Sequence, residues 1–502
     1  MNSVDYVNSN FLSKVSMSSL NKLQSQFGSK SSLPISFEHA YYSHQISSMR
    51  KPKNNGIRMT LAPMHKVLNT KNETYETILT FIYRTLALNE EQKELAKKIN
   101  KEPFPTKDII INKDDGTVTM GSFLQLFLYL THPTSTSDYQ KDFLRIYISF
   151  ATARLLIAYL ITRYFAMEDM NDKNLIYLRA KVLEIIENWV SNSPNHFDEN
   201  MKEALEVFMN FLSNNIDEKL FYEKLKEIVE ILRGKENKIC NECSEDDSKP
   251  PIVELPKIPE NQWTLLNIPP IELARQVTIV HYSIFKEIQS DELLVEILQG
   301  RKNAFDNIDK LIKHFTNFSN YVSLTILLGE TPKARGKIYK NWIDVAHEFL
   351  VLNNFHGVFS VMMGLIHRSV SRMTKTIKHA LRTNSVRKAN YENLLHICDI
   401  SDDFQNYRKF ISGIKDQCIP FIGVYQKDLI YVQETYPSKI DNLINFKKCH
   451  ECCKLISIIQ NYQKKGYNFT VAHRIQQLLS YLPEPTDSKD LMNLSISKEK
   501  KK

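Results

Sequence analysis

The segment from Pro420 to Gln463 constrains the fold of this chain more than any other. It reads PFIGVYQKDLIYVQET, then YPSKI, then DNLINFKKCHECCKLISIIQNYQ. Pro437 is incompatible with one continuous helix, and it biases Tyr436 away from helical backbone angles. After this break an apolar stripe recurs at spacings of three, four and three residues, at Cys452, Leu455, Ile459 and Tyr462. The segment therefore predicts two antiparallel helices joined at a break around YPSKI.

The first arm of this hairpin carries an unusual pair of side chains. Ile430 and Glu434 are four residues apart, so they share one face of the helix. One long apolar side chain beside one carboxylate makes a poor core-facing surface. We therefore expect this face to probe a partner rather than to pack inside the protein.

Composition favours helices in the rest of the chain as well. The 502 residues include only 13 glycines, well below the roughly 7% of average chains. Glycine and proline punctuate sheets and turns, and no alternating apolar and polar run is long enough to indicate a sheet. The predicted fold class is all-α, with two helical domains, of which the larger carries the protruding hairpin.

The charge pattern argues against one class of partner and leaves another open. The net charge of +8 is spread over 65 basic and 57 acidic side chains, too thinly to indicate nucleic-acid binding. Residues 1–60 contain seven Lys or Arg against Asp5 and Glu38, and the C-terminal SKEKKK is also basic. Such ends favour an anionic membrane surface, although solvated, disordered ends are the commoner alternative.

Seven cysteines, an odd number, and the lack of an apolar signal segment at the start fit a reducing cytosol. We expect a cytoplasmic protein, and the basic ends add the hypothesis of recruitment to the inner face of the plasma membrane. The most apolar stretch, Ile146 to Phe165, contains Arg154 and Arg163. It therefore predicts a buried helix rather than a membrane span.

Cysteine spacing invites a metal-site interpretation in two places. Cys240 and Cys243 form a CNEC pair that no second pair follows. Cys449, Cys452 and Cys453 lie near one helical face, but three thiols without a fourth ligand make an incomplete zinc site. We favour structural or tolerated cysteines, and we expect neither a metal nor another cofactor.

Shifts in composition divide the chain into six parts. We expect residues 1–68 to be mostly disordered, 69–108 to be a helical preface, 109–215 to be a first helical domain, 216–255 to be a charged linker, 256–485 to be a second, larger helical domain, and 486–502 to be a basic tail.

Seven short motifs in the larger domain identify a family resemblance. They are PPIELARQVTIVHYSIFKEIQSDELL, KHFTNFSNYV, ARGKIYKNWIDVAHEFLVLNNF, QNYRKF, PFIGVY, INF and QNYQ. Their order resembles that of the catalytic domain of the Ras-family guanine-nucleotide exchange factors, which insert a helical hairpin into a small GTPase. The helices of residues 109–215 resemble the Ras exchanger motif, which precedes that domain in much of the family and braces the hairpin.

The resemblance implies roles for individual residues. Ile430 and Glu434 would enter the GTPase at its Mg²⁺ and phosphate site. An apolar pocket for the second switch of the GTPase would consist of Ile312, Phe359, Phe404 and Phe421, all of which could instead be ordinary core. Phe404 weighs against that alternative, because DISDDFQNY gives it little apolar company. We expect Arg275, Arg335 and Arg408 to brace helices rather than to touch a partner.

Two positions depart from the family pattern. Lys313 follows the first pocket residue and keeps the charge of a basic residue without the planar fork of Arg. Ile366 lies in LIHRS, where the family usually has Asn, so a hydrogen bond to the GTPase would be lost. The turn after the first arm, TYPS, also lacks the usual Gly-Asn.

The leading functional hypothesis is an exchange factor for a Ras-like small GTPase, of Ras or Rap type, that makes and breaks no covalent bond. The departures leave a second hypothesis open, a GTPase-binding scaffold or adaptor with weak exchange activity. A third, a membrane-associated helical adaptor without GTPase contact, depends only on the basic ends. The chain has no Gly-rich phosphate loop, so it is not itself predicted to be a GTPase.

Overall fold

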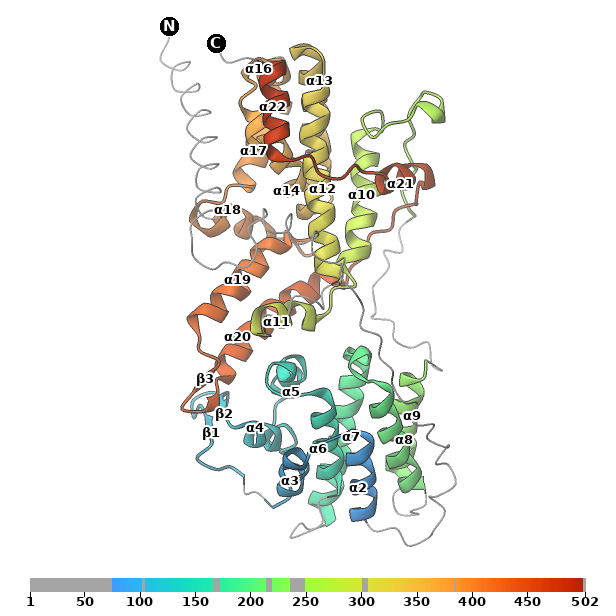
Figure 1. The fold of residues 1–502 in the computed structure, drawn as a ribbon, viewed down its shortest axis with the longest axis vertical. Coiled ribbons are helices and arrows are strands. Elements are labelled where there is room, and N and C mark those ends of the chain that lie inside the picture. The colour runs from blue at the N-terminus through green and yellow to red at the C-terminus, as the bar shows by residue number, and fades with distance from the viewer. Residues whose placement is uncertain are drawn as a thin grey trace, which may run out of the picture.

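The computed structural model describes residues 75–101, 104–165, 172–213, 219–234, 249–299, 306–382 and 385–499. The predicted disordered region 1–68, the pair Cys240 and Cys243, and the final lysines 500–502 lie outside the described residues. Within them helices dominate, which confirms the predicted all-α class. The helices form two bodies joined by a long hairpin (Figure 1).

The first body contains eight α-helices of the described chain, drawn from blue to green in Figure 1. Their order is α2 (Tyr75–Thr85), α3 (Glu90–Lys98), α4 (Phe123–Leu130), α5 (Ser137–Ile146), α6 (Ala153–Tyr164), α7 (Asp172–Asn192), α8 (Glu199–Ser213) and α9 (Lys219–Leu232). Ser122, Thr136 and Thr152 start α4, α5 and α6 by accepting a hydrogen bond from a backbone N–H three residues later. The stretch Ile146 to Phe165, predicted as a buried helix, is divided: a 3-10 turn occupies Tyr147–Ser149, and α6, which is buried along most of its length, begins only at Ala153.

Helix α9 corrects the predicted charged linker 216–255. Phe221, Leu225, Ile228 and Val229 are buried along one face of α9, which packs against α7 and α8. This spacing is an amphipathic stripe, and the many charged residues between its members obscured it. We therefore propose that the first domain extends to residue 234. Helices α2 and α3 of the predicted preface pack against α8 and α6, so we propose that they belong to it as well.

The second body is larger and runs in Figure 1 from light green to red. Its α-helices are α10 (Pro270–Phe285), α11 (Ser290–Gln299), α12 (Asp306–Leu328), α13 (Pro332–Val351), α14 (Phe355–Ile366), α15 (Arg368–Ser371), α16 (Thr374–Leu381), α17 (Ser385–Ile397), α18 (Ser401–Ile411), α19 (Ile422–Thr435), α20 (Phe446–Gln463), α21 (His473–Ser480) and α22 (Ser488–Lys498). Helices α10, α12, α13 and α14 pack on one another and bury Trp342 and Phe349. Gly364 allows α14 to approach α12 closely, because a Cβ there would lie 2.6 Å from the carbonyl oxygen of Ser319.

Helix α22 corrects the predicted basic tail 486–502. It packs against α12 and α15, and it buries Leu491 and Ser495. Glu499, just after the helix, reaches the fully buried Arg335 at 3.4 Å and accepts a hydrogen bond from the backbone N–H of Lys375 at 2.7 Å. The apolar stripe is short and includes a serine, so periodicity alone did not reveal it.

The hairpin consists of α19 and α20, which pack against each other as predicted. Between them lie two short strands, β3 (Lys439–Ile440) and β4 (Leu443–Ile444). The chain reverses at Asp441 and Asn442, whose φ angles of 49° and 65° are those of a tight two-residue turn. The predicted position of the turn, TYPS, is therefore wrong. The tip of the hairpin lies a few residues further along, at Asp441 and Asn442.

This tip is joined to the first body by a small antiparallel sheet. Strands β1 (Ile109–Ile111) and β2 (Val118–Gly121) come from the first body, and the strand order is β1-β2-β4-β3. Gly121 of β2 pairs with Ile444 of β4. Sequence alternation did not reveal these strands, because each has four residues or fewer. The sheet attaches the free end of the hairpin to the first domain.

Candidate functional site: the exposed hairpin face and an aromatic cluster

The predicted probe residues lie on the outer face of α19. Leu429 and Val432 are buried on the inner side of the helix, whereas Ile430 is only half-buried and Glu434 is exposed. Within the described part of the chain, Glu434 has no hydrogen-bond or ion-pair partner. The site therefore presents an aliphatic side chain and an unpaired carboxylate together at the surface.

Arg408 on α18 fixes the direction of this arm. Its Nη1 and Nη2 donate to the two carboxylate oxygens of Asp428 on α19 at 2.8 and 2.7 Å. Its Nε donates to the carbonyl oxygen of Asp403 at 2.8 Å, and Nη2 also reaches the Asp403 carboxylate. The hydrogen bonds to Asp428 raise the pKa of Arg408. This two-pronged contact gives angular control that a single charge could not.

Three of the four predicted pocket residues meet beside the base of α19. Phe359 and Phe421 stack with ring centroids 4.2 Å apart, and Phe404 lies 6.2 and 6.4 Å from them. We call these three residues the aromatic cluster. Phe359 and Phe421 are buried, whereas Phe404 is half-buried. Lys427 of α19 lies over the Phe404 ring at 5.6 Å. The cluster is therefore open to a partner mainly at Phe404.

The backbone at Phe404 is unusual. Asp402, Asp403 and Phe404 have φ angles of 50°, 58° and 58° in succession. Left-handed backbone is tolerable for Asp but costs energy at Phe. Such strain persists only where surrounding contacts enforce it, and here Arg408 and Lys427 both contact Asp403. The contacts that hold α19 thus also hold the segment that presents Phe404.

The other predicted binding residues are less closely grouped. Ile312 on α12 is half-buried and packs against the part of the core that contains Ile422, whereas the aromatic cluster belongs to the other part of the core. Lys313 is exposed and lies 3.6 Å from Glu484. Ile366 is half-buried at the end of α14.

The remaining two arginines, like Arg408, make contacts within the protein. Arg335 is fully buried, and its Nε donates to the hydroxyl of Thr376 at 3.0 Å. Arg275 is largely buried and lies 3.4 Å from Glu272. These internal contacts agree with the bracing role expected from the sequence, which stays a prediction.

Sequence reasoning missed the side chains that surround the aromatic cluster. Phe315 stacks on Phe421 at 5.6 Å and contacts His356 at 5.2 Å. His281, whose Nε2 lies 3.0 Å from His314 Nδ1, also contacts His356. Burial lowers the pKa of His314 to about 4 and that of His356 to about 3, so both rings are neutral at pH 7. His314 and Phe315 closely follow Ile312 in the motif KHFTNFSNYV. This closeness to a predicted pocket residue was the sequence signal for their place beside the aromatic cluster.

The second arm of the hairpin is held by the first body. His450 of α20 lies 2.6 Å from the carboxylate of Asp142 on α5. Arg145, also on α5, donates to Ser457 and Gln460 at 2.8 Å each. These contacts join residues more than 300 positions apart and could not be read from the sequence.

Two of the three cysteines of α20, Cys449 and Cys453, lie at the same interface. Cys449, Cys452 and Cys453 are buried, and Cys453 Sγ lies 3.6 Å from the carbonyl oxygen of Asp142. Burial raises the pKa of all three thiols, which disfavours thiolate. Within the described ranges no group of three or more His, Cys, Asp or Glu side chains is arranged to hold a metal ion. The three thiols are therefore buried in their neutral form.

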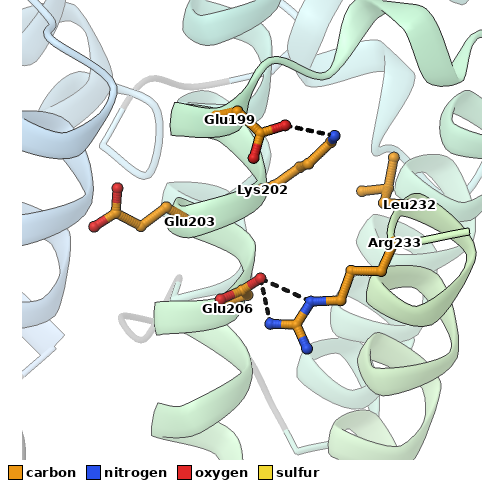
Figure 2. A pocket seen from close by; sticks show the side chains of 6 residues that line it. All are labelled: Glu199, Lys202, Glu203, Glu206, Leu232 and Arg233. Atoms are coloured by element: carbon orange, nitrogen blue, oxygen red, sulfur yellow. Dashed lines mark hydrogen bonds and ion pairs between the residues drawn. The ribbon is translucent and has the colours of Figure 1, made fainter. Parts of the chain in front are cut away.

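A surface hollow between α8 and α9 does not resemble a reaction site (Figure 2). Lys202 pairs with Glu199 at 2.7 Å, and the guanidinium of Arg233 pairs with Glu206. Its charged groups thus largely neutralise one another, and it belongs to the first body rather than to the hairpin.

No helix among the described residues is long and apolar enough to cross a membrane.

Comparison with known proteins gives two family matches. Residues 272–450 match the family described as the RasGEF domain, and residues 117–213 match the RasGEF N-terminal motif. Both matches lie inside the domains predicted from the sequence. The hairpin's first arm, the aromatic cluster and most of the second body fall in the first match, and α4 to α8 fall in the second.

Several curated proteins are similar over most of this chain. Ras guanine nucleotide exchange factor S of Dictyostelium discoideum is 28% identical over 417 residues, which cover 77% of this chain and 38% of that protein. Factor R of the same organism is 30% identical over 72% of this chain and 21% of its own length. Protein son of sevenless of Drosophila melanogaster is 28% identical over 61% of this chain and 19% of its own. The chain thus spans well under half the length of each of these relatives.

Proposed function

We propose that this chain, which belongs to the RasGEF family and has a RasGEF N-terminal motif ahead of its RasGEF domain, is a guanine-nucleotide exchange factor for a Ras-like small GTPase. The observation that carries the proposal is the unpaired, exposed Glu434 beside Ile430 on the outer face of α19. An acidic group without an internal partner is available to the GTPase, and α19 presents it at the end of a braced arm.

The two side chains would act on different parts of the nucleotide site. A GTPase holds its nucleotide through a Mg²⁺ ion that bridges the phosphates and through P-loop hydrogen bonds. Ile430 offers no oxygen ligand, so its entry at the ion's position would remove coordination. Glu434 would accept the P-loop hydrogen bonds that phosphate otherwise takes, and its charge would repel the phosphate.

The free energy needed to release a tightly bound nucleotide can come from thermodynamic linkage alone. Near-picomolar nucleotide binding corresponds to roughly −16 kcal/mol. A protein that binds the empty GTPase more tightly than the loaded form weakens nucleotide binding by the same factor. No covalent bond forms or breaks, and GTP then enters because it exceeds GDP in the cell.

The aromatic cluster would supply the anchor on the same GTPase. Large apolar side chains in a desolvated pocket commonly dominate such interfaces, and Phe404 is the half-exposed member that a partner could reach. We propose a GTPase of Ras or Rap type, with Ile312, Lys313 and Ile366 at the edges of the contact.

Release of fluorescent GDP from a panel of purified Ras, Rap, Ral and Rho-like GTPases tests the proposal. We expect acceleration of a Ras-like member, and we expect Glu434→Ala to reduce it by about 10- to 100-fold because a transition-state contact is lost. Glu434→Gln separates the charge from the hydrogen-bonding capacity. Glu223→Ala, at an exposed carboxylate on α9, is the matched control and should leave exchange unchanged.

The outcomes separate the two functional hypotheses. Binding to a nucleotide-free GTPase without acceleration of any panel member would favour a scaffold or adaptor, in which the departure at Ile366 and the altered hairpin turn have removed activity. Absence of binding to every member would contradict both hypotheses.

We also propose recruitment from the cytoplasm to the inner face of the plasma membrane. The support is compositional, namely the excess of seven Lys or Arg over two acidic residues in 1–60 and the basic C-terminal residues. Sedimentation with vesicles containing phosphatidylserine should therefore weaken when residues 1–60 are deleted, and more so at low than at high salt. Equal sedimentation of the full-length protein and of the variant without residues 1–60 would exclude this role for the N-terminal region.

A further inference from the structure

We infer that Tyr431 is a third residue of α19 that contacts the GTPase, and that it contributes to the choice between GTPases. Tyr431 is 66% exposed, one of the more exposed large side chains in the described chain. It lies next to Ile430 in sequence and three residues before Glu434. This inference depends on the proposed function, because it assigns a further contact to the same partner.

Helical geometry places Tyr431 on the same outer surface as the two predicted probe residues. With about 100° per residue, Glu434 lies about 40° around the axis from Ile430, and Tyr431 lies about 100° from it in the same direction. Glu434 therefore stands between Ile430 and Tyr431 around the helix. A protein surface that receives both Ile430 and Glu434 is therefore close to Tyr431, about 60° further around the helix than Glu434.

The packing of α19 agrees with this geometry. Leu429 and Val432, the neighbours on either side of the pair 430–431, are buried. The exposed face is thus bounded by residues that hold the helix in place. No hydrogen bond, ion pair or ring contact engages Tyr431 within the described residues. Its ring and hydroxyl are both available to a partner.

The chemistry of Tyr suits an interface at the edge of the inserted face. A large ring with a polar tip buries apolar area while keeping one hydrogen-bonding group, and Tyr is enriched among residues that dominate binding. Ile430 and Glu434 would act on the nucleotide site itself, which is common to GTPases. Tyr431 would touch the surface beside it, where GTPases differ, so it is placed to discriminate between them.

The test compares Tyr431→Ala and Tyr431→Phe with a matched control, Tyr481→Ala. Tyr481 is 75% exposed at the end of α21, outside the hairpin. We expect Tyr431→Ala to weaken binding to the preferred nucleotide-free GTPase by about 5- to 20-fold. We expect it also to change the relative exchange rates across the GTPase panel. Tyr431→Phe should retain most of the binding if the ring supplies the contact, and Tyr481→Ala should change neither quantity.

The outcomes distinguish this inference from the proposed function. If the unmodified protein accelerates no GTPase, the proposed function fails. If it accelerates exchange and Glu434→Ala reduces the rate, but Tyr431→Ala changes binding less than two-fold with every GTPase, only the inference fails. An equal loss in Tyr481→Ala would also overturn it. Thermal unfolding midpoints that match the unmodified protein exclude misfolding as the cause of any loss.

Discussion

At the scale of single residues, one network links the two parts of the candidate site. Arg408 holds Asp428 on the hairpin arm and Asp403 in the left-handed segment that presents Phe404. Lys427 contacts both Asp403 and the Phe404 ring. The network therefore connects the segment that presents Phe404 with the outer face of α19.

We predict that Asp428→Asn lowers exchange several-fold, because Arg408 loses the charged half of its contact and α19 loses its fixed direction. The matched control is Asp344→Asn, since Arg387 grips Asp344 in the same two-pronged way at 2.8 Å between α13 and α17. Both substitutions should cost about 0.5–1 kcal/mol of unfolding free energy, measured by urea denaturation. Only Asp428→Asn should slow GDP release. Equal exchange rates in the two variants would show that the contact stabilises the fold without positioning the arm.

At the scale of elements, prediction from sequence succeeded where one periodic stripe or one helix-breaking residue dominates. The two arms of the hairpin belong to this class, whereas α6 was predicted from its overall apolar composition. Prediction failed at α9, where the charge of the wider segment outweighed a regular amphipathic stripe, and at α22, where polar and charged residues outnumber the apolar ones. The end of α22 is held by a polar contact, since Glu499, just after the helix, forms an ion pair with the buried Arg335. No periodicity can reveal a helix that is held in this way.

At the scale of the whole molecule, the hairpin is a bridge between two bodies. Its base belongs to the second body, its tip pairs with β2, and its second arm lies on α5 (Figure 1). A helical arm attached only at its base would sample many directions. Attachment at the tip and along α20 leaves the outer face of α19 exposed while its orientation stays fixed.

We predict that Arg145→Ala lowers exchange by about two- to five-fold, because α20 loses the hydrogen bonds of Ser457 and Gln460 to the first body. Amide hydrogen exchange in α20 should become faster in the same variant. Arg154→Ala is the control, since Arg154 pairs with Asp198 inside the first body and does not touch the hairpin. If Arg145→Ala changes neither the rate of nucleotide exchange nor the protection of the α20 amides, a bracing role for this contact is contradicted.

The sequence by itself determined the helical class, the break in the hairpin and the pairing of Ile430 with Glu434 on one face. These features are local, because the backbone limits of Pro437 and the 3.6-residue helical repeat act over a few residues. Only the tertiary structure decided that Glu434 is unpaired, that Phe359, Phe404 and Phe421 meet, and that α5 and β2 hold the hairpin. Those facts depend on contacts between residues far apart in the chain, whose choice of partner is settled by the packing of the whole molecule.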